Sequence, residues 1–338
     1  MTVTYEASRY SRGRATVMGV ATVLILWFHS NVIVPEGSLL EFFKLTGDIG
    51  VEMFLIASGA GIYFAVEKYA TYRSYILSRL RRVLPVFLLA TIPWFLYKEY
   101  SWGGGRSLMS VLWNASTLSY WLEGNLTCWY VSSILVLYLL TPAYVKLWKK
   151  YPRFHVCAIG AVYLFGSLVV YKTGLLGHLS IFLYRIPVYL WGLSLGKAIR
   201  EGRAFRINLP LAAAVSAVCL FLVASALGRT GFFVPWSYKY FFYGPLAMVL
   251  SLMCSCIPVN PVTNHLGKRS LEIYLLFEKS IEILCNVRPM WALFGTTNIA
   301  FCAVALLVTL VGAEILALAA ELLVKLPGRM LDKHKQPQ

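Results

Sequence analysis

A histidine and a glutamate in two neighbouring apolar segments are the residues of this sequence best placed for acid–base chemistry. His29 lies about thirteen residues into the segment 16–34, roughly 20 Å from its inner end at 1.5 Å per residue. Glu52 lies about six residues into the segment 46–67, which runs back the other way and brings it to nearly the same depth. An imidazole oriented by a carboxylate can act as a general base that removes the proton from an incoming hydroxyl. The alternative is a structural His–Glu pair that holds two helices together.

Three arginines before a proline form a second candidate site. Arg79, Arg81 and Arg82 precede Pro85 at the inner end of the segment 82–98. Guanidinium groups make bidentate, charge-assisted hydrogen bonds with phosphates, so this cluster is suited to a phosphorylated substrate. The bias of basic residues toward the cytoplasmic ends of membrane spans accounts for the same residues without a ligand.

Two further segments carry charge at membrane depth. Arg185 enters the segment 179–198 about two turns below its outer end, where it is either a cavity residue or an interfacial anchor. The segment 270–286 holds an unusual density of charge, consisting of Glu272, Glu278, Lys279 and Glu282. Lys279 and Glu282 are three residues apart and can pair along a helix. We expect this helix to face protein or water rather than lipid.

Apolar segments long enough to cross a bilayer position these residues. The 338-residue chain is 59% hydrophobic and 14% charged, with a mean hydropathy of +0.67. Because backbone amides in hydrocarbon must be satisfied within each segment, such runs predict helices. We expect an all-α polytopic membrane protein of about ten transmembrane helices, forming a single domain over residues 1–338. The expected spans are 16–34, 46–67, 82–98, 128–146, 154–172, 179–198, 207–228, 239–257, 270–286 and 298–324.

The positive charge of the chain indicates orientation rather than nucleic-acid binding. The 31 Lys and Arg residues give a net charge of +16, but they fall mostly in alternate loops instead of on one soluble face. Placing those loops in the cytoplasm puts both termini there as well. We therefore expect a multi-pass protein of a bacterial plasma membrane, with membrane lipid as a partner and no nucleic acid. No spacing of cysteine and histidine indicates a zinc site.

Several segments resemble, in order, the motifs of the membrane acyltransferase-3 family. The segment Met18–His29 ends in histidine as the family's opening helix does, and Gly50-Val51-Glu52-Met53-Phe54 resembles its second-span signature. Arg79 and Arg82, followed by Pro85, match its arginine motif. The later motifs are Trp129-Tyr130, Arg185-Ile186-Pro187 with Gly192 and Gly196, and the segment Gly267–Leu275. The ordered set covers nearly the whole chain.

Two positions depart from the family pattern. Met18 stands eleven residues before His29, where the family usually has an arginine, and Arg14 lies one turn earlier. Phe277 stands where the ninth span often has a histidine. The first departure bears on the donor site and the second removes one possible contact, whereas His29 itself is retained.

The resemblance implies an acyl-CoA donor, most often acetyl-CoA, and the hydroxyl of an extracytoplasmic glycan or a related acceptor. His29, oriented by Glu52, would deprotonate that hydroxyl, which attacks the thioester directly; no metal is implied. The residues that the resemblance assigns to the phosphates of the donor are Arg79, Arg81 and Arg82, with Arg14 as a further candidate. Candidates for binding the substrate or the developing oxyanion are Ser58, Tyr130 and Arg185.

Two other functions are compatible with the same residues. The first is an exporter of a polysaccharide or a lipid-linked sugar, in which buried ionisable groups couple transport to protons. The second is a sensor or scaffold that keeps the fold without catalysis. Transport folds often show paired halves with interrupted helices, and no such internal symmetry is apparent here. The arginine motif together with His29 favours acyl transfer, with the acceptor and the acyl group left open.

Overall fold

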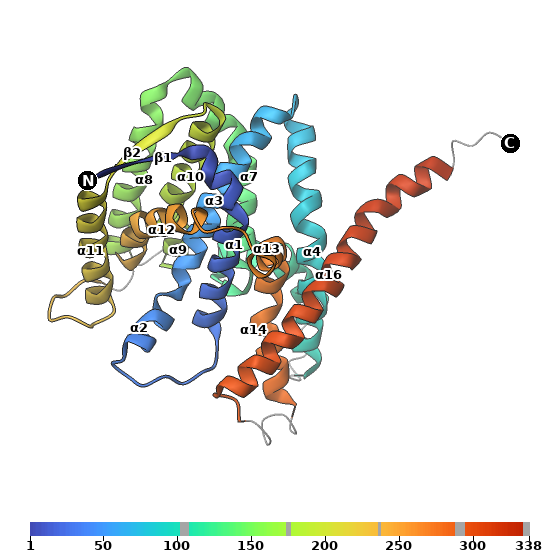
Figure 1. Cartoon of the computed structure of the whole chain (residues 1–338). Helices are drawn as coiled ribbons and strands as arrows, with labels where there is room; N and C mark the ends of the chain where they lie inside the picture. Colours follow the sequence, from blue (N-terminus) through green and yellow to red (C-terminus); the bar gives the residue numbers. More distant parts are fainter. Residues whose placement is uncertain (102–107, 174–176, 236–237, 288–294, 334–338) are drawn as a thin grey trace. The chain divides into compact units, whose positions relative to one another are not determined.

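The described part of the chain is mainly helical. A computed structural model describes residues 1–101, 108–173, 177–235, 238–287 and 295–333. Helices account for 82% of the structure, so the prediction of an all-α membrane protein is confirmed in its broad form (Figure 1).

The chain forms two compact units, and each is assembled from three separate segments. Unit 1 contains Met1–Phe28, Val34–Tyr72 and Val136–Lys268. Unit 2 contains His29–Ile33, Arg73–Leu135 and Arg269–Gln338. Because the segments alternate along the sequence, no single chain boundary separates the units, and the single-domain assignment stays a prediction.

Unit 1 holds most of the helices and both strands. Its elements are β1 (Thr2–Glu6), α1 (Ala7–His29, whose last residue belongs to unit 2), α2 (Leu39–Leu45), α3 (Gly50–Lys68), most of α7 (Trp129–Lys150), α8 (Pro152–Thr173), α9 (Ser180–Leu183), α10 (Ile186–Arg200), β2 (Ala204–Asn208), α11 (Leu209–Ala226), α12 (Lys239–Ser255) and α13 (Pro261–Lys268). Unit 2 contains the start of α7 together with α4 (Tyr72–Ser101, whose first residue belongs to unit 1), α5 (Leu108–Ala115), α6 (Leu118–Glu123), α14 (Ser270–Asn286) and α16 (Ile299–Lys333).

Five helical segments are long and apolar enough to cross a membrane. They are Leu39–Lys68, Tyr72–Tyr100, Leu126–Lys150, Leu209–Ala226 and Ile299–Lys325. Each overlaps one of the ten expected spans. The other five expected spans coincide with α1, α8, α10, α12 and α14, of which α10 has 15 residues and α12 and α14 have 17 each. Because about 20 residues cross a bilayer, the count of ten spans and the side on which the termini lie stay predictions.

Glycines let α3 and α10 approach closely in unit 1. A Cβ atom on Gly192 would lie 2.5 Å from the carbonyl oxygen of Ile56, and one on Gly196 would lie 2.6 Å from that of Ala60. The two contacts advance together by four residues on both helices, so α3 and α10 run parallel. Small residues four apart are the usual means of close helix packing in membranes. The parallel arrangement brings the first turn of α3 to the start of α10.

The structure also contains a small antiparallel sheet, which the all-α prediction did not include. β1 pairs with β2, and the register places Val3 opposite Ile207 and Tyr5 opposite Phe205 (Figure 1). Tyr5 is the buried residue of β1 and Ile207 is half-buried in β2, whereas the other residues of the two strands are exposed. The Tyr5 hydroxyl lies 2.6 Å from that of Ser255 at the end of α12.

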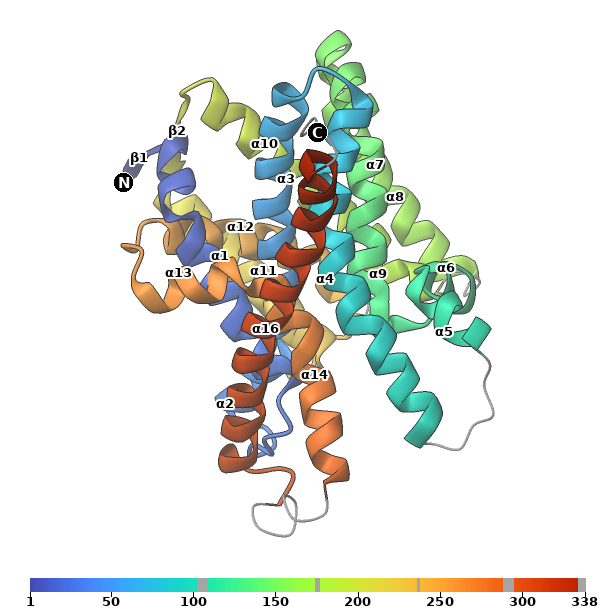
Figure 2. The ribbon, with the colours of Figure 1, turned by 90° about the vertical axis from the view of Figure 1, so that its right-hand side faces the viewer.

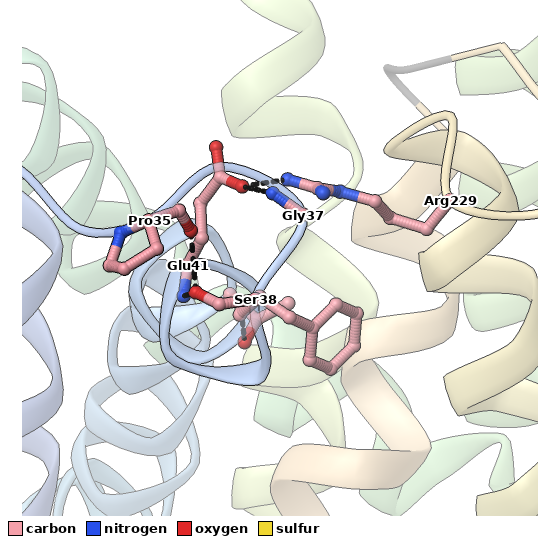
Figure 3. Close-up of polar contacts among 7 residues, drawn as sticks. Pro35, Gly37, Ser38, Glu41 and Arg229 are labelled. Carbon is pink, nitrogen blue, oxygen red and sulfur yellow. Dashed lines mark hydrogen bonds and ion pairs between the residues drawn. The ribbon is translucent and has the colours of Figure 1, made fainter.

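A capped short helix follows α1 in unit 1 (Figure 3). Ser38 is the N-cap of α2, and its hydroxyl accepts a hydrogen bond from the backbone N–H of Glu41 at 3.1 Å. The Glu41 carboxylate in turn accepts from the N–H of Gly37 at 2.6 Å and forms an ion pair with Arg229. Ser-x-x-Glu is the sequence signature of such reciprocal capping, so this helix was readable from the sequence although the expected spans omit it.

In unit 2, α14 and α16 lie side by side (Figure 2). The guanidinium of Arg269, just before α14, donates two hydrogen bonds to Glu314 of α16, at 2.9 and 3.0 Å. This bidentate pair fixes the start of α14 relative to α16. The charged residues of α14 begin one turn further on.

Candidate active site

His29 lines a polar cavity in unit 2. The cavity has a volume of about 420 Å³, and α4 and α14 contribute most of its wall. Its lining residues are His29, Asn31, Trp94, Lys98, Thr127, Glu278, Lys279, Ile281, Glu282 and Cys285. Charged and amide groups at this density make a wet cavity rather than a surface for lipid tails.

A carboxylate of α14 contacts the imidazole. Nδ1 of His29 lies 2.6 Å from Oε1 of Glu278. A carboxylate at this distance accepts a hydrogen bond from Nδ1–H, which leaves Nε2 as the nitrogen that takes up a proton. The side chains of His29 and Glu278 are 29% and 62% exposed, so the pair faces an open cavity rather than a sealed core. This is the geometry of a general base held by a positioning carboxylate.

A second ion pair and a buried lysine complete the charged wall. Lys98 of α4 lies 3.1 Å from Glu282 of α14. Lys279 donates a hydrogen bond to the carbonyl oxygen of Leu275 at 2.6 Å. The ammonium groups of Lys98 and Lys279 lie 5.1 and 5.8 Å from the centre of the Trp94 ring, where both interact with the π face.

The expectation that Glu52 orients His29 needs correction. In unit 1, Oε1 of Glu52 lies 2.8 Å from Nε of Arg185, and the two side chains are 0% and 4% exposed. The parallel packing of α3 on α10 produces this pair, because it brings the first turn of α3 to the residue that precedes α10. An estimate of depth along a span does not say which way a side chain points. The carboxylate that contacts His29 is that of Glu278.

Arg185 and Glu52 belong to a buried network of four charges in unit 1. Nζ of Lys239 lies 2.9 Å from one oxygen of Asp48, and the hydroxyl of Tyr243 donates to the other at 2.8 Å. The guanidinium of Arg185 also stacks 4.3 Å above the ring of Tyr240. Asp48 is only 6% exposed. Arg185 is therefore a buried ion-pair partner and not an anchor.

The arginines of the predicted donor site lie near the start of α4 in unit 2. Arg79 is half-buried and its Nε donates to the hydroxyl of Ser78 at 3.1 Å, whereas Arg81 and Arg82 are exposed. The charge of Arg82 interacts with that of Glu272 on α14. From Arg82 to Trp94 is twelve residues along α4, or about 18 Å. One helix therefore joins the arginine cluster to the cavity.

The remaining sequence candidates are distributed over both units. Arg14 on α1 and Ser58 on α3 are half-buried residues of unit 1. Tyr130, at the start of α7, packs its ring 5.3 Å from that of Tyr274, one turn before Glu278 on α14. Tyr274 and Glu278 lie on the same face of α14. Tyr130 is therefore the oxyanion candidate that contacts the helix carrying the carboxylate bound to His29.

Sequence reasoning missed several cavity residues. Glu278 and Lys279 were noted only for the charge density of their helix, and the expected pair between Lys279 and Glu282 is replaced by the pair between Lys98 and Glu282. Asn31 and Trp94 carried no signal, because a single amide or indole near the end of a span is usually interfacial.

The fold and the cavity define a helical membrane protein with a His–carboxylate pair beside an arginine-bearing helix. The family described as an acyltransferase domain matches residues 18–318, and the chain belongs to this family. The match extends over all the residues discussed at the cavity and the arginine cluster. Comparisons with curated proteins and with solved structures found no match.

Proposed function

We propose that this membrane acyltransferase moves an acyl group from acyl-CoA to a hydroxyl of its acceptor, with His29 as the general base. The observation that carries the proposal is the 2.6 Å contact between Nδ1 of His29 and Glu278 in the wall of the cavity. It supports the tautomer with a proton on Nδ1, in which Nε2 is the nitrogen that can accept the proton of a hydroxyl.

The transfer is a direct displacement. Nε2 of His29 takes the proton of the acceptor hydroxyl as its oxygen attacks the thioester carbonyl, and a tetrahedral intermediate forms. The intermediate collapses by breaking the carbon–sulfur bond, and the imidazolium returns the proton to the sulfur of CoA. The acceptor leaves as an ester and the donor as free CoA, so no acyl-enzyme is required.

The donor binds through the arginine cluster. Arg79, Arg81 and Arg82 contact the phosphates of CoA at the cytoplasmic end of α4, since guanidinium groups suit phosphate oxygens. The pantetheine arm then follows α4 toward the cavity. The distance of about 18 Å along the helix is close to the length of such an extended arm. Arg14, on α1 in unit 1, stays a candidate from the sequence that this scheme does not use.

The acceptor enters the cavity from the outer side of a bacterial plasma membrane. A cavity of about 420 Å³ with amide, hydroxyl and charged groups suits one or two sugar rings, which supports a glycan-type acceptor. The acyl group that we propose is acetyl, because it is the one that the family resemblance most often implies. Glu52 and Arg185 contribute by holding α3 to α10 in unit 1.

The test is release of free CoA by the purified protein in liposomes that contain acetyl-CoA and a polysaccharide acceptor. We expect the His29→Ala variant to lose about 10²- to 10⁴-fold in turnover, because that is the usual contribution of a general base. The His155→Ala variant is the matched control, because His155 lies in unit 1, bonded to Tyr144 and Ser194. Full acylation of the acceptor by His29→Ala would contradict the proposal.

A binding measurement tests the donor site separately. Reversing the charge at Arg79 and Arg82 should abolish binding of acetyl-CoA to the detergent-solubilised protein. Reversal at Arg203, an exposed arginine of unit 1 paired with Glu201, is the control. An exporter would move the glycan without consuming acetyl-CoA, so the appearance of free CoA also separates the two functions.

A further inference from the structure

Lys279 is a buried cation in the wall of the His29 cavity. It follows Glu278 on α14, and only 9% of its surface is exposed. Its Nζ donates one hydrogen bond, to the carbonyl oxygen of Leu275. The ammonium group also lies 5.8 Å from the centre of the Trp94 ring, so of its three N–H donors at least one remains for a partner in the cavity.

The carboxylates beside Lys279 are bound to other groups. Glu278 contacts His29 at 2.6 Å, and Glu282 contacts Lys98 at 3.1 Å. Within the described part of the chain, no ion pair joins Lys279 to a carboxylate. A cation in a buried site without its own anion is costly, and an uncharged side chain of the same length would fill the same space. The positive charge therefore points to a negative charge that arises in the cavity.

We propose that Lys279 stabilises the oxyanion of the tetrahedral intermediate; this inference rests on the acyl transfer proposed above. When the acceptor oxygen forms its bond to the thioester carbon, the π electrons of the carbonyl move to its oxygen. The ammonium of Lys279 donates to that oxygen while His29 holds the acceptor proton. The carbonyl then re-forms, the carbon–sulfur bond breaks, and Lys279 keeps its own proton throughout.

Geometry and charge both favour Lys279 over the hydroxyl candidates. It lines the same cavity as His29 and neighbours the residue that holds the imidazole. Ser58 and Tyr130 carry uncharged hydroxyl groups, and the ring of Tyr130 packs against that of Tyr274. Hydrogen bonds from a charged donor are about twice as strong as those from a neutral one, and a fixed positive group stabilises a developing oxyanion.

The first test replaces Lys279 by methionine, which keeps the length and removes the charge. We expect kcat for CoA release to fall about 10²- to 10³-fold with little change in KM for acetyl-CoA, as when one oxyanion donor is lost. Lys279→Arg should retain part of the rate. The matched control is Lys325→Met, because Lys325 is an exposed lysine of α16 that pairs with Glu321.

Chemical rescue separates charge from packing. Lys279→Ala leaves space that a small cation can enter, so added methylammonium should restore a measurable part of kcat, whereas neutral ethanol of similar size should not. A structural lysine would show no such selectivity. This measurement remains decisive if Lys279→Met folds poorly, because the kcat of Lys279→Ala is compared with and without the added amine in the same protein preparation.

The outcomes distinguish this inference from the function on which it rests. A wild type that releases CoA in a His29-dependent way, together with a slow Lys279→Met and rescue by methylammonium, supports both. An active wild type with Lys279→Met within a few-fold of its kcat overturns the role of Lys279 and leaves the acyl transfer standing. A wild type that releases no CoA overturns the proposed function and this inference with it.

Discussion

The two units hold similar sets of charges and use them differently. Unit 1 buries two carboxylates and two cations as two ion pairs, Glu52 with Arg185 and Asp48 with Lys239. The cavity of unit 2 also has two carboxylates and two lysines, but it adds an imidazole and opens to solvent. Buried ion pairs fix helices relative to one another. A cavity that holds a base and a cation without a carboxylate partner can instead bind and convert a substrate. The number of charges is therefore a poor guide to function; their exposure and pairing decide it.

The largest expected effect comes from breaking one pair of the unit 1 network. Arg185→Met leaves the Glu52 carboxylate buried without its partner, which costs about 3–5 kcal/mol. The melting temperature in detergent should fall sharply. In the double variant Glu52→Leu with Arg185→Met most of that loss should be recovered, and turnover per folded molecule should stay near the wild-type value. A stable double variant without turnover would show that the unit 1 pair takes part in the chemistry.

The next largest effect tests the positioning carboxylate of unit 2. Glu278→Gln keeps the shape of the side chain but no longer favours Nδ1–H on His29, so we expect kcat/KM to fall about 100-fold, or about 2.7 kcal/mol. The melting temperature should change little, because the pair is exposed to the cavity. The pH profile of kcat/KM is the second readout. If Glu278 were purely structural, the acid limb of this profile would lie at the same pH in Glu278→Gln as in the wild type.

A smaller effect concerns the hydrogen bond that completes the unit 1 network. Tyr243→Phe removes a donor from the buried Asp48 carboxylate, which costs about 1.5–3 kcal/mol for a hydrogen bond to a charged group. Thermal unfolding in detergent measures the loss. Tyr238→Phe, at the N-cap residue of α12, serves as the control. An unchanged melting temperature together with slower turnover would contradict a purely structural network.

The smallest effect is expected at the half-exposed pair of the cavity. Lys98→Met removes the ion pair to Glu282, in which the two side chains are 33% and 32% exposed. Pairs exposed to this extent contribute about 0–1 kcal/mol, so stability should hardly change. Any effect on kinetics should appear in KM for the acceptor rather than in kcat. A loss in kcat as large as that of Lys279→Met would show that the lysines act together and that the contrast between them is wrong.

The sequence predicted the parts of the site that depend on residue type and order along one helix. His29 carries its own signal, because an ionisable group deep in an apolar segment rarely faces lipid, and the structure sets it in a polar cavity. The charge density around Glu278 correctly indicated a helix that faces protein or water. Five apolar helices also overlap expected spans, because hydropathy is a local property that can be read from the sequence of each segment.

The partners of those residues could not be predicted, because pairing depends on how distant helices rotate and cross. Glu52 and Glu278 are both carboxylates at suitable depth, and only the parallel packing of α3 on α10 turns Glu52 toward Arg185. The glycines at 192 and 196 were noted as a motif, but their contacts with Ile56 and Ala60 belong to the tertiary fold. The short sheet was missed for another reason: its strands are five residues each and lie about 200 residues apart.

That separation sets an order of events during synthesis. Thr2 pairs with Asn208, so β1 emerges from the ribosome long before its partner exists. At translation speeds of about 5–20 residues per second, the strand waits roughly 10–40 s with its backbone groups unsatisfied by any sheet. The helices between the two strands are inserted during this interval. Closure of the sheet therefore comes after three of the five helices long and apolar enough to cross a membrane have been made, and it joins β1 to a bundle that is already partly assembled.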